Sequence, residues 1–511
     1  MSVPWEFVGQ LVLYSLHYWW AALAGVVVGF VAGAIPGLSP SNTIIMLLPL
    51  TLVLGPDAGL IFMVCIYISA QVGNSVPAIL INIPGTGGAA ATTLDGYPMA
   101  VQGKATQALV LSFVASILGG VVATLLTLAL LPYLGRMGLY MRSVEMVAVM
   151  MLGLTLIAVI GTRDILKALI AGFLGLLMGA IGTDAIYSQP RATFGFLELY
   201  DGVPIVPALI GLFAISEVLN LIERERVVQA QGDQPVRLSA RWVDIADGLR
   251  TSLRHWWEIV RAALVGLVIG IIPGAGADIA SFVAYQQART FSRYPHRFGT
   301  GVPEGVLAPE SANNGVTSGA MVPLLALGVP GGLTTAVMLV ALEYQGVQLG
   351  PRLFMERPLL AYGIFVSMLL GYVLIVLTLL PLTRYMARLT LVPSRYLGPI
   401  ILFFCMVGSF APRAMLFDMV LAVVLGLVGY VARRTGYPVA SMVVGFILGP
   451  LFERYLTRSL RLAGGNVLVL FSSPLADVLW AMAVLALVIP YLRERRERQA
   501  AATPAATTPA A

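Results

Sequence analysis

Long apolar stretches fill most of the chain and limit the folds open to it. Each is close to the roughly 20 residues that a helix needs to cross a bilayer. Only 11% of the 511 residues are charged, against about 25% in a soluble domain. So few charges cannot cover a water-facing surface, and the sequence therefore predicts an all-α polytopic membrane protein. The stretches are residues 11–35, 106–134, 144–161, 165–186, 203–222, 359–381, 397–411, 415–432 and 473–492.

Shorter or interrupted apolar segments lie between the long ones. A helix interrupted by Pro or Gly either kinks or enters the membrane only part of the way, so the stretches alone do not give the number of crossings. We expect about 10–12 transmembrane helices together with discontinuous or re-entrant helices. The shorter segments are 42–55, 58–72, 75–84, 258–272, 278–288, 318–330, 333–343 and 437–452.

Basic residues stand in short clusters between the apolar stretches. The net charge is +6, and this placement follows the positive-inside rule for cytoplasmic loops rather than the pattern of a nucleic-acid-binding surface. We therefore expect a lipid bilayer, and no nucleic acid, among the partners. Cys65 and Cys405 both lie inside apolar runs, which argues against a disulfide or a structural metal site.

Two polar segments divide the chain. Residues 223–257 carry several arginines and predict a cytoplasmic linker, with an amphipathic helix on the membrane surface around Trp242–Trp257. Residues 493–511 begin with the basic run RERRER and end in an Ala-Thr-Pro tail, for which we expect disorder. The linker separates a predicted N-terminal membrane repeat, 1–222, from a C-terminal membrane repeat, 258–492.

The two halves resemble each other in sequence. VGFVAGAIPGLSP at 28–40 aligns with VGLVIGIIPGAGA at 265–277, an offset of 237 residues. GNSVPAILINIPGT at 73–86 aligns with GAMVPLLALGVPGG at 319–332, an offset of 246. Arg250, Arg254 and Arg261 precede the second half, whereas Glu6 and no basic residue precede the first, so the positive-inside rule favours an inverted repeat.

Each repeat contains two Pro-Gly breaks at corresponding places. In lipid, broken backbone is tolerated only where protein or a water-filled cavity satisfies it. The N-terminus of a half-helix presents free N–H groups and partial positive charge, which suits a carboxylate. Unwound carbonyl oxygens suit Na⁺. The breaks are therefore the predicted binding site, and a packing kink is the alternative interpretation of each one.

The candidate residues lie in or beside these four breaks. For substrate binding they are Ser39, Ser41, Asn42, Asn74, Ser75, Asn82, Gly85, Thr86, Gly87, Asn313, Asn314, Gly331, Gly332 and Thr334. For ion coupling they are Pro36, Gly37, Gly274, Gly276, Asp278 and Glu310. Polar residues in apolar segments are often functional, but amides and hydroxyls also form interhelical packing contacts, and Asp278 suits a helix N-cap. We expect no catalytic residue, cofactor or structural metal; the coupling ion is Na⁺ or H⁺.

Four stretches resemble the large membrane subunit, TctA, of the bacterial tripartite tricarboxylate transporters. The strings N-I-P-G-T…L-D-G-Y-P-M-A and A-P-E-S-A-N-N are the specific ones, and the order of apolar segments matches over nearly all of 11–492. The stretches are AIPGLSPSNTIIMLLPLT (34–51), ILINIPGTGGAAATTLDGYPMAVQGKA (79–105), IIPGAGADIASFVAY (271–285) and PEGVLAPESANNGVTSGAMVPLLALGVPGGLTTAVMLVAL (303–342).

The resemblance implies a function that composition does not show. A periplasmic solute-binding protein captures an organic carboxylate, and the large subunit, with a small four-helix membrane subunit, moves it inward across the bacterial inner membrane. A Na⁺ or H⁺ gradient, and not ATP, drives an elevator-like movement. The absence of the nucleotide-binding motif G-x-x-x-x-G-K-[ST] from the sequence agrees with this. The sequence departs from the usual family pattern beside the breaks, at 37–40, 72–75 and 329–332. The resemblance therefore does not identify which carboxylate is carried.

Two other functions compete with a coupled carrier. An uncoupled organic-anion channel would show rings of one charge or a repeated filter, and the sequence has neither. A membrane-embedded enzyme would need paired aspartates, a serine with a base, or a histidine-rich metal site. His17, His255 and His296 are dispersed along the chain, so a non-enzymatic importer is the leading interpretation.

Overall fold

The computed structural model describes a chain that is almost entirely helical. The described residues are 5–35, 38–139, 141–160, 164–184, 189–220, 223, 242–274, 276–379 and 394–502. Within them, the strands are limited to one antiparallel pair, β1 (Gly182–Thr183) and β2 (Pro190–Arg191). The predicted all-α membrane class is confirmed.

The chain forms two compact units that do not coincide with the two predicted repeats. The larger unit contains Met1–Tyr140 and Ile181–Thr435, and the smaller unit contains Met141–Ala180 and Gly436–Ala511. Each unit therefore takes segments from both halves of the sequence. The division at 223–257 into repeats stays a prediction.

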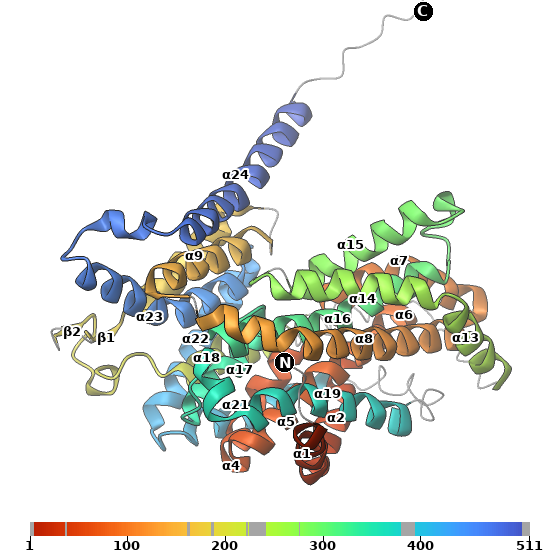
Figure 1. Ribbon diagram of the computed structural model, residues 1–511, viewed down its shortest axis with the longest axis horizontal. Helices are drawn as coiled ribbons and strands as arrows, with labels where there is room; N and C mark the ends of the chain where they lie inside the picture. Colours follow the sequence, from red (N-terminus) through yellow and green to blue (C-terminus); the bar gives the residue numbers. More distant parts are fainter. Residues whose placement is uncertain are drawn as a thin grey trace, which may run out of the picture. The chain divides into compact units, whose positions relative to one another are not determined.

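The larger unit carries most of the helices, drawn from red to light blue in Figure 1. Its first part contains α1 (Trp5–His17), α2 (Trp19–Gly33), α3 (Pro40–Met46), α4 (Leu48–Leu54), α5 (Pro56–Gly73), α6 (Ser75–Ile81), η1 (Gly87–Ala89), α7 (Ala90–Met99), η2 (Ala100–Lys104) and α8 (Ala105–Leu139). Its second part contains η3 (Leu197–Leu199), α11 (Ile205–Leu209), η4 (Ile210–Ile215), α13 (Trp242–Arg254), α14 (Trp256–Ile271), α15 (Gly276–Phe291), η5 (Pro295–Arg297), α16 (Glu304–Leu327), α17 (Leu333–Tyr344), α18 (Pro351–Glu356), α19 (Pro358–Leu379), α21 (Ser394–Phe410) and α22 (Leu416–Arg434).

The smaller unit consists of helices from two distant parts of the chain. It contains α9 (Ser143–Ile160), α10 (Ile165–Gly179), α23 (Val439–Leu462), η7 (Val467–Phe471) and α24 (Pro474–Ala502). Gly175 allows α10 to approach α23 closely, because a β-carbon there would overlap the backbone of Met442. α24 continues through residues 493–502, so the basic part of the predicted disordered tail is helical, as its Arg, Glu and Ala content favours. Residues 503–511 lie outside the described residues.

Several helices are long and apolar enough to cross a membrane. Among the described residues these are five: Pro56–Ile81, Gly87–Tyr133, Pro358–Thr378, Leu416–Arg434 and Val439–Leu462. The pair α1 and α2, bent by 59°, would make a sixth. Shorter apolar helices of 10–17 residues accompany them, so the expected total of about 10–12 crossings stays a prediction.

Two helix pairs pack through glycines at equivalent places of the repeat. α2 packs on α5 in the first half, and α14 packs on α16 in the second. A β-carbon on Gly29 of α2 would overlap the backbone oxygen of Ile66, and one on Gly266 of α14 would overlap that of Ala312. Gly29 and Gly266 are 237 residues apart, and their contacts are 246 apart, as in the sequence alignment.

A second glycine pair repeats this relation from the partner helices. A β-carbon on Gly73, at the end of α5, would lie 2.6 Å from the oxygen of Phe30. One on Gly319 of α16 would lie 2.5 Å from the oxygen of Leu267. The same backbone-to-backbone approach therefore recurs in both halves, which supports a structural repeat; its inverted orientation stays a prediction.

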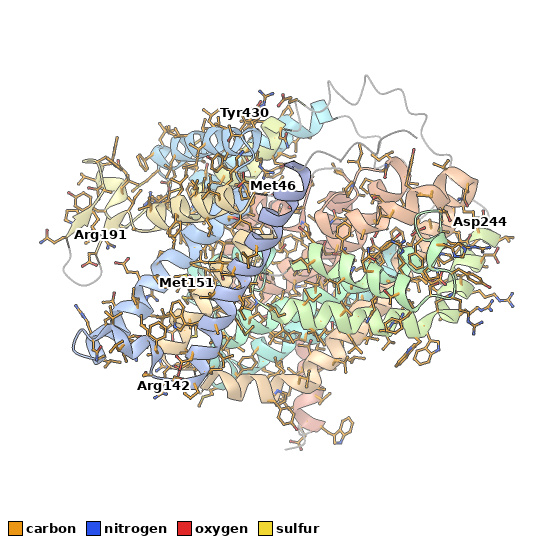
Figure 2. The ribbon with its side chains drawn as sticks, turned by 90° about the horizontal axis from the view of Figure 1, so that it is seen from above. Met46, Arg142, Met151, Arg191, Asp244 and Tyr430 are labelled. Carbon is orange, nitrogen blue, oxygen red and sulfur yellow. The ribbon has the colours of Figure 1, made fainter. Side chains whose placement is uncertain are left out.

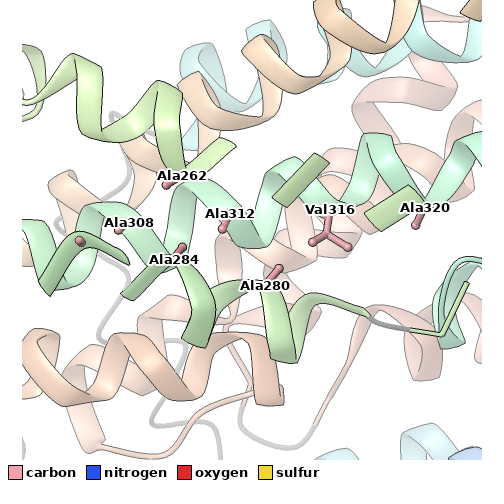
Figure 3. Packing of buried hydrophobic residues seen from close by; sticks show 8 residues of the cluster. Ala262, Ala280, Ala284, Ala308, Ala312, Val316 and Ala320 are labelled. Atoms are coloured by element: carbon pink, nitrogen blue, oxygen red, sulfur yellow. The ribbon is translucent and has the colours of Figure 1, made fainter. Parts of the chain in front are cut away.

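Small side chains bring α14, α15 and α16 together in the second half. Figure 3 shows them lining the space between the three helices: Ala262 on α14, Ala280 and Ala284 on α15, and Ala308, Ala312, Val316 and Ala320 on α16. All are at most 1% exposed. Small residues at helix interfaces allow close backbone approach in membrane proteins. α8 packs on the same helix, α16, beside them (Figure 1).

The predicted linker is described only in part. Residues 224–241 lie outside the described residues, but α13 confirms a helix near Trp242–Trp257; Asp244 marks its first turn in Figure 2. α13 packs on α8, where a β-carbon on Gly248 would lie 2.8 Å from the side chain of Val110. Trp242, Trp256 and Trp257 are exposed, as expected of aromatic residues at a membrane interface.

Candidate functional site

The third break forms a glycine loop that three polar side chains surround. We define the glycine loop as Gly85–Gly88, between α6 and α7. A β-carbon on Gly85 would overlap the Asn74 side-chain oxygen; one on Gly87 would lie 2.5 Å from the Asp278 carboxyl group; and one on Gly88 would lie 2.6 Å from the Asn313 oxygen. Glycine is therefore required sterically along the loop. The fold brings together three predicted residues that are up to 239 positions apart, from the junction of α5 and α6, from α15 and from α16.

The Asp278 carboxylate lies beside η1, the short helical turn that leads into α7. It lies close enough to the backbone N–H of Gly88 to interact with it electrostatically, and it belongs to the first turn of α15. Two helix N-termini therefore flank one carboxylate, as their partial positive charge favours. Asp278 is itself exposed. The loop predicted to bind a substrate carboxylate thus lies next to a carboxylate of the protein. The spacing of residues along the chain does not predict this contact between Asp278 and the glycine loop.

Two buried amides beside the loop have atoms without hydrogen-bond partners. Asn74 and Asn313 are 0% exposed. The Nδ2 of Asn74 donates to Gln71 at 3.1 Å and to Thr86 Oγ1 at 3.3 Å, but its Oδ1 has no partner, and neither amide atom of Asn313 has one. A buried polar group without a partner costs about 1–3 kcal/mol. A polar ligand bound at the glycine loop would supply hydrogen bonds to these unpartnered amide atoms.

Asn314 faces a different group of side chains. Its Oδ1 accepts from the Tyr372 hydroxyl at 3.5 Å, and that hydroxyl is 3.4 Å from Thr317 Oγ1. Its Nδ2 has no partner. On a helix, adjacent residues point about 100° apart, which explains why Asn313 and Asn314 serve different neighbours.

The fourth break closes on itself and on the second break. Gly274 N–H donates to the oxygen of Gly331 at 2.9 Å. Gly332 N–H donates to Thr335 Oγ1 at 2.9 Å, and this hydroxyl also bonds the Gly332 oxygen. The N-terminus of α17 is thus capped by its own side chain, with the predicted Thr334 buried next to it.

Gly274 and Gly276 have positive φ values of 84° and 66°, in the left-handed region that glycine adopts most easily. Positive φ at both positions lets the chain turn sharply from α14 into α15. These two predicted residues are therefore required by backbone geometry. Their ion-coupling role stays a prediction.

The first break is described only on its C-terminal side. Pro36 and Gly37 lie outside the described residues. Ser39 caps α3, because its Oγ accepts from Asn42 N–H at 3.1 Å, and it lies 3.2 Å from Ser41 Oγ. Asn42 lines a pocket with Leu38, Met46, Ala214, Glu217, Val218 and Ile401. Within the described residues, no hydrogen bond joins Ser39, Ser41 or Asn42 to the glycine loop.

Two further predicted residues have local structural contacts. Asn82 ends α6 in the left-handed conformation, φ 56°, and the equivalent Gly328 ends α16 at φ 69°. Asn is among the few non-glycine residues that tolerate this conformation. Ser75 donates to the oxygen of Val72 at 2.7 Å. Their contribution to substrate binding stays a prediction.

Glu310 lies in a separate cluster on α16. It is 0% exposed; Thr92 Oγ1 on α7 donates to Oε1 at 2.5 Å, and Ser116 Oγ on α8 donates to Oε2 at 3.0 Å. Within the described part of the chain, no Lys, Arg or His pairs with this carboxyl group. Glu310 and Asp278, both predicted for ion coupling, therefore have different surroundings.

Sequence reasoning missed Asp95, which organises the loop before α16. Its carboxylate accepts from the backbone N–H groups of Gly299, Gly301 and Val302 at 2.7–3.1 Å. It also accepts from the Tyr285 hydroxyl at 2.9 Å. Asp95 is 0% exposed. Two signals were available, the position of Asp95 within the family-specific string L-D-G-Y-P-M-A and its acidic side chain in a largely apolar stretch, and neither predicts its partners.

These features define the class to which the protein belongs: a multi-pass helical membrane transporter built around broken helices. The description "Tripartite tricarboxylate transporter TctA family" matches residues 20–444. The chain belongs to this family, whose members are large subunits of tricarboxylate transporters.

Two relatives come from Agrobacterium vitis. The "Uncharacterized 52.8 kDa protein in TAR-I ttuC' 3'region" is 35% identical over 480 residues, 93% of this chain and 94% of the relative. The "Uncharacterized protein in TAR-II ttuC' 3'region" is 34% identical over 236 residues, 46% of this chain and 98% of the relative. No solved structure matches the chain.

Proposed function

We propose that this chain is the permease of a secondary carrier that imports a tricarboxylate or related organic carboxylate, driven by a Na⁺ or H⁺ gradient. The observation that supports this most is the carboxylate of Asp278 at the glycine loop, beside the unpartnered amide of Asn313. A loop that accommodates a protein carboxylate beside the backbone N–H of Gly88 has the chemistry to accept one from a substrate.

In this proposal the substrate takes the place of Asp278. A substrate carboxylate accepts from the N–H of Gly88, and the amides of Asn74 and Asn313 complete its hydrogen bonds. Two carboxylates about 4 Å apart repel by roughly 4 kcal/mol at an effective dielectric constant of 20. Asp278 therefore withdraws, or binds the coupling cation, when the substrate enters.

The proposed partners follow from the family. A periplasmic solute-binding protein delivers the carboxylate, and a small four-helix membrane subunit assembles with this chain in the bacterial inner membrane. The proposal includes no catalytic step and no cofactor. Movement of the helices around the four breaks, in the manner of an elevator, would carry the site across the membrane.

The test is transport in reconstituted vesicles containing this chain, the small subunit and the binding protein. Labelled citrate and a panel of di- and tricarboxylates are offered under an imposed Na⁺ or proton gradient. Uptake against a concentration gradient, driven by one of these ions, supports the proposal. Equilibrative flux that ignores every gradient would instead favour an uncoupled organic-anion pore.

A further inference from the structure

Glu310 is a buried acid whose surroundings suit a proton better than a metal cation. Its carboxylate lies between α16, α7 and α8, and hydroxyl groups of Thr92 and Ser116 donate to its two oxygens. The oxygen–oxygen distances are 2.5 and 3.0 Å, which are hydrogen-bond distances. An ion held at about 2.4 Å from its ligands would spread neighbouring oxygens to about 3.4 Å. The two oxygen–oxygen distances therefore leave no room for a metal cation between these groups.

Among the side chains that the structure describes, no charged group pairs with Glu310. α8 carries no charged residue between 105 and 135. Within the described residues, the charged groups on α7, α14 and α15 are engaged elsewhere: Asp95 with Tyr285 and the loop at 299–302, Glu258 with Arg261, Asp278 with Gly88, and Arg289 near Tyr285.

The remaining elements packed against α16 contribute no charge to Glu310 either. Asp57 on α5, Glu343 on α17, and Arg352 and Glu356 on α18 stand in terminal turns of their helices. Glu304, at the start of α16, pairs with His255. An ionised carboxylate without a counter-charge is costly in an apolar interior, and protonation removes that cost.

Glu310 is connected to the substrate site by two routes. It precedes Asn313 by three residues on α16, about one helical turn. Its partner Thr92 follows Gly88 by four residues on η1 and α7. A threonine hydroxyl commonly donates to the carbonyl four residues earlier, so a Thr92 hydroxyl released by Glu310 has the Gly88 carbonyl within reach. Changes at Glu310 can therefore be transmitted to the glycine loop.

We propose that Glu310 is the proton-binding group of this carrier, with Thr92 and Ser116 as the hydroxyls that alternate between donating to its carboxylate and accepting from its carboxyl O–H. One proton adds to a carboxylate oxygen from water on one side and returns to water on the other. The coupling role rests on the proposed function; the binding of the proton does not.

Infrared difference spectroscopy tests proton binding without a substrate. The full-length protein in liposomes is titrated with acid, and the carbonyl stretch of a protonated buried carboxyl group is followed. We expect this band in the wild type and its loss in Glu310→Gln. Glu145→Gln is the matched control, because Glu145 is 2% exposed but accepts from Arg142 N–H at 2.9 Å; it should keep the band. An unchanged band in Glu310→Gln overturns the proposal.

Thr92→Val keeps the test decisive if Glu310→Gln does not fold. Removing a hydroxyl that donates to the carboxylate should move the midpoint of the band's titration to higher pH, and an unmoved midpoint contradicts the assignment. Adding Na⁺ at constant pH separates proton from cation: loss of the band with Na⁺ would show that a cation occupies the site instead.

Citrate uptake in the three-component vesicles then tests coupling. We expect a proton gradient to drive accumulation in the wild type and to lose its effect in Glu310→Gln. If the wild type does not transport any acid of the panel, the proposed function fails, but the infrared result still decides whether Glu310 binds a proton. If Glu310→Gln accumulates citrate as the wild type does, the coupling role is excluded.

Discussion

Two adjacent glycines of the fourth break should differ sharply in their tolerance of alanine. A β-carbon on Gly331 would lie 2.7 Å from the Cα and 2.9 Å from the Cβ and oxygen of Ala320. A β-carbon on Gly332 would meet only the Cα of Gly276, at 3.9 Å. Gly332 has an extended φ of −173°. Because neither glycine needs a positive φ, the comparison isolates the steric contact.

The cost of Gly331→Ala follows from these distances. Non-bonded carbons prefer about 3.5–4.0 Å, so the loop must move by about 1 Å. Such a shift stretches the 2.9 Å bond between Gly274 N–H and the Gly331 oxygen beyond hydrogen-bonding range. Overpacking costs about 1–3 kcal/mol and the lost hydrogen bond about 1 kcal/mol, which together give about 2–4 kcal/mol.

Thermal unfolding of the purified protein in detergent measures this difference. At about 2 °C per kcal/mol, Gly331→Ala should lower the apparent Tm by roughly 4–8 °C, and Gly332→Ala should leave it near the wild-type value. Uptake should fall in Gly331→Ala, and Gly331→Leu or Gly85→Leu should abolish it. Equal Tm values for the two alanine variants would refute the steric reasoning.

Three other predictions concern polar groups that are buried or partly buried. Asp95→Asn should destabilise the protein by about 2–4 kcal/mol, because charge-assisted bonds to three backbone N–H groups weaken; an unchanged Tm would contradict this. Asn313→Ala should raise the KM for the transported acid about tenfold, the equivalent of one hydrogen bond, while Asn466→Ala, at a helix cap, should not; equal KM values would make packing the better explanation. His255 precedes the apolar part of α14. Its side-chain hydrogen bond with Glu304 raises the pKa of His255. The stability that this pair adds is therefore full between about pH 4.5 and 6.5. It is lost as pH rises through the raised pKa of His255 and as pH falls through the lowered pKa of Glu304, so the Tm values of wild type and Glu304→Gln should differ most in this window.

The sequence determined the class of the protein and much of its framework. Scarce charge and long apolar stretches leave a membrane protein as the one consistent solution, because lipid needs no charged cover. The repeated glycines marked the places where two helix pairs approach. Gly29 and Gly266 are recognisable in the alignment because close backbone packing requires the same residue in both halves.

Only the tertiary structure decided which polar residues meet. Asp278 reaches Gly87 and Glu310 reaches Thr92 across about 190 and 218 positions of the chain, and no local pattern encodes such pairs. The structure also separated roles that looked alike: Asn82 ends a helix in the left-handed conformation, whereas Asn313 has two unpartnered atoms beside the glycine loop. The physical reason is that periodicity and residue type fix where a helix forms and which face is apolar. The partner of each polar side chain depends on how the helices pack.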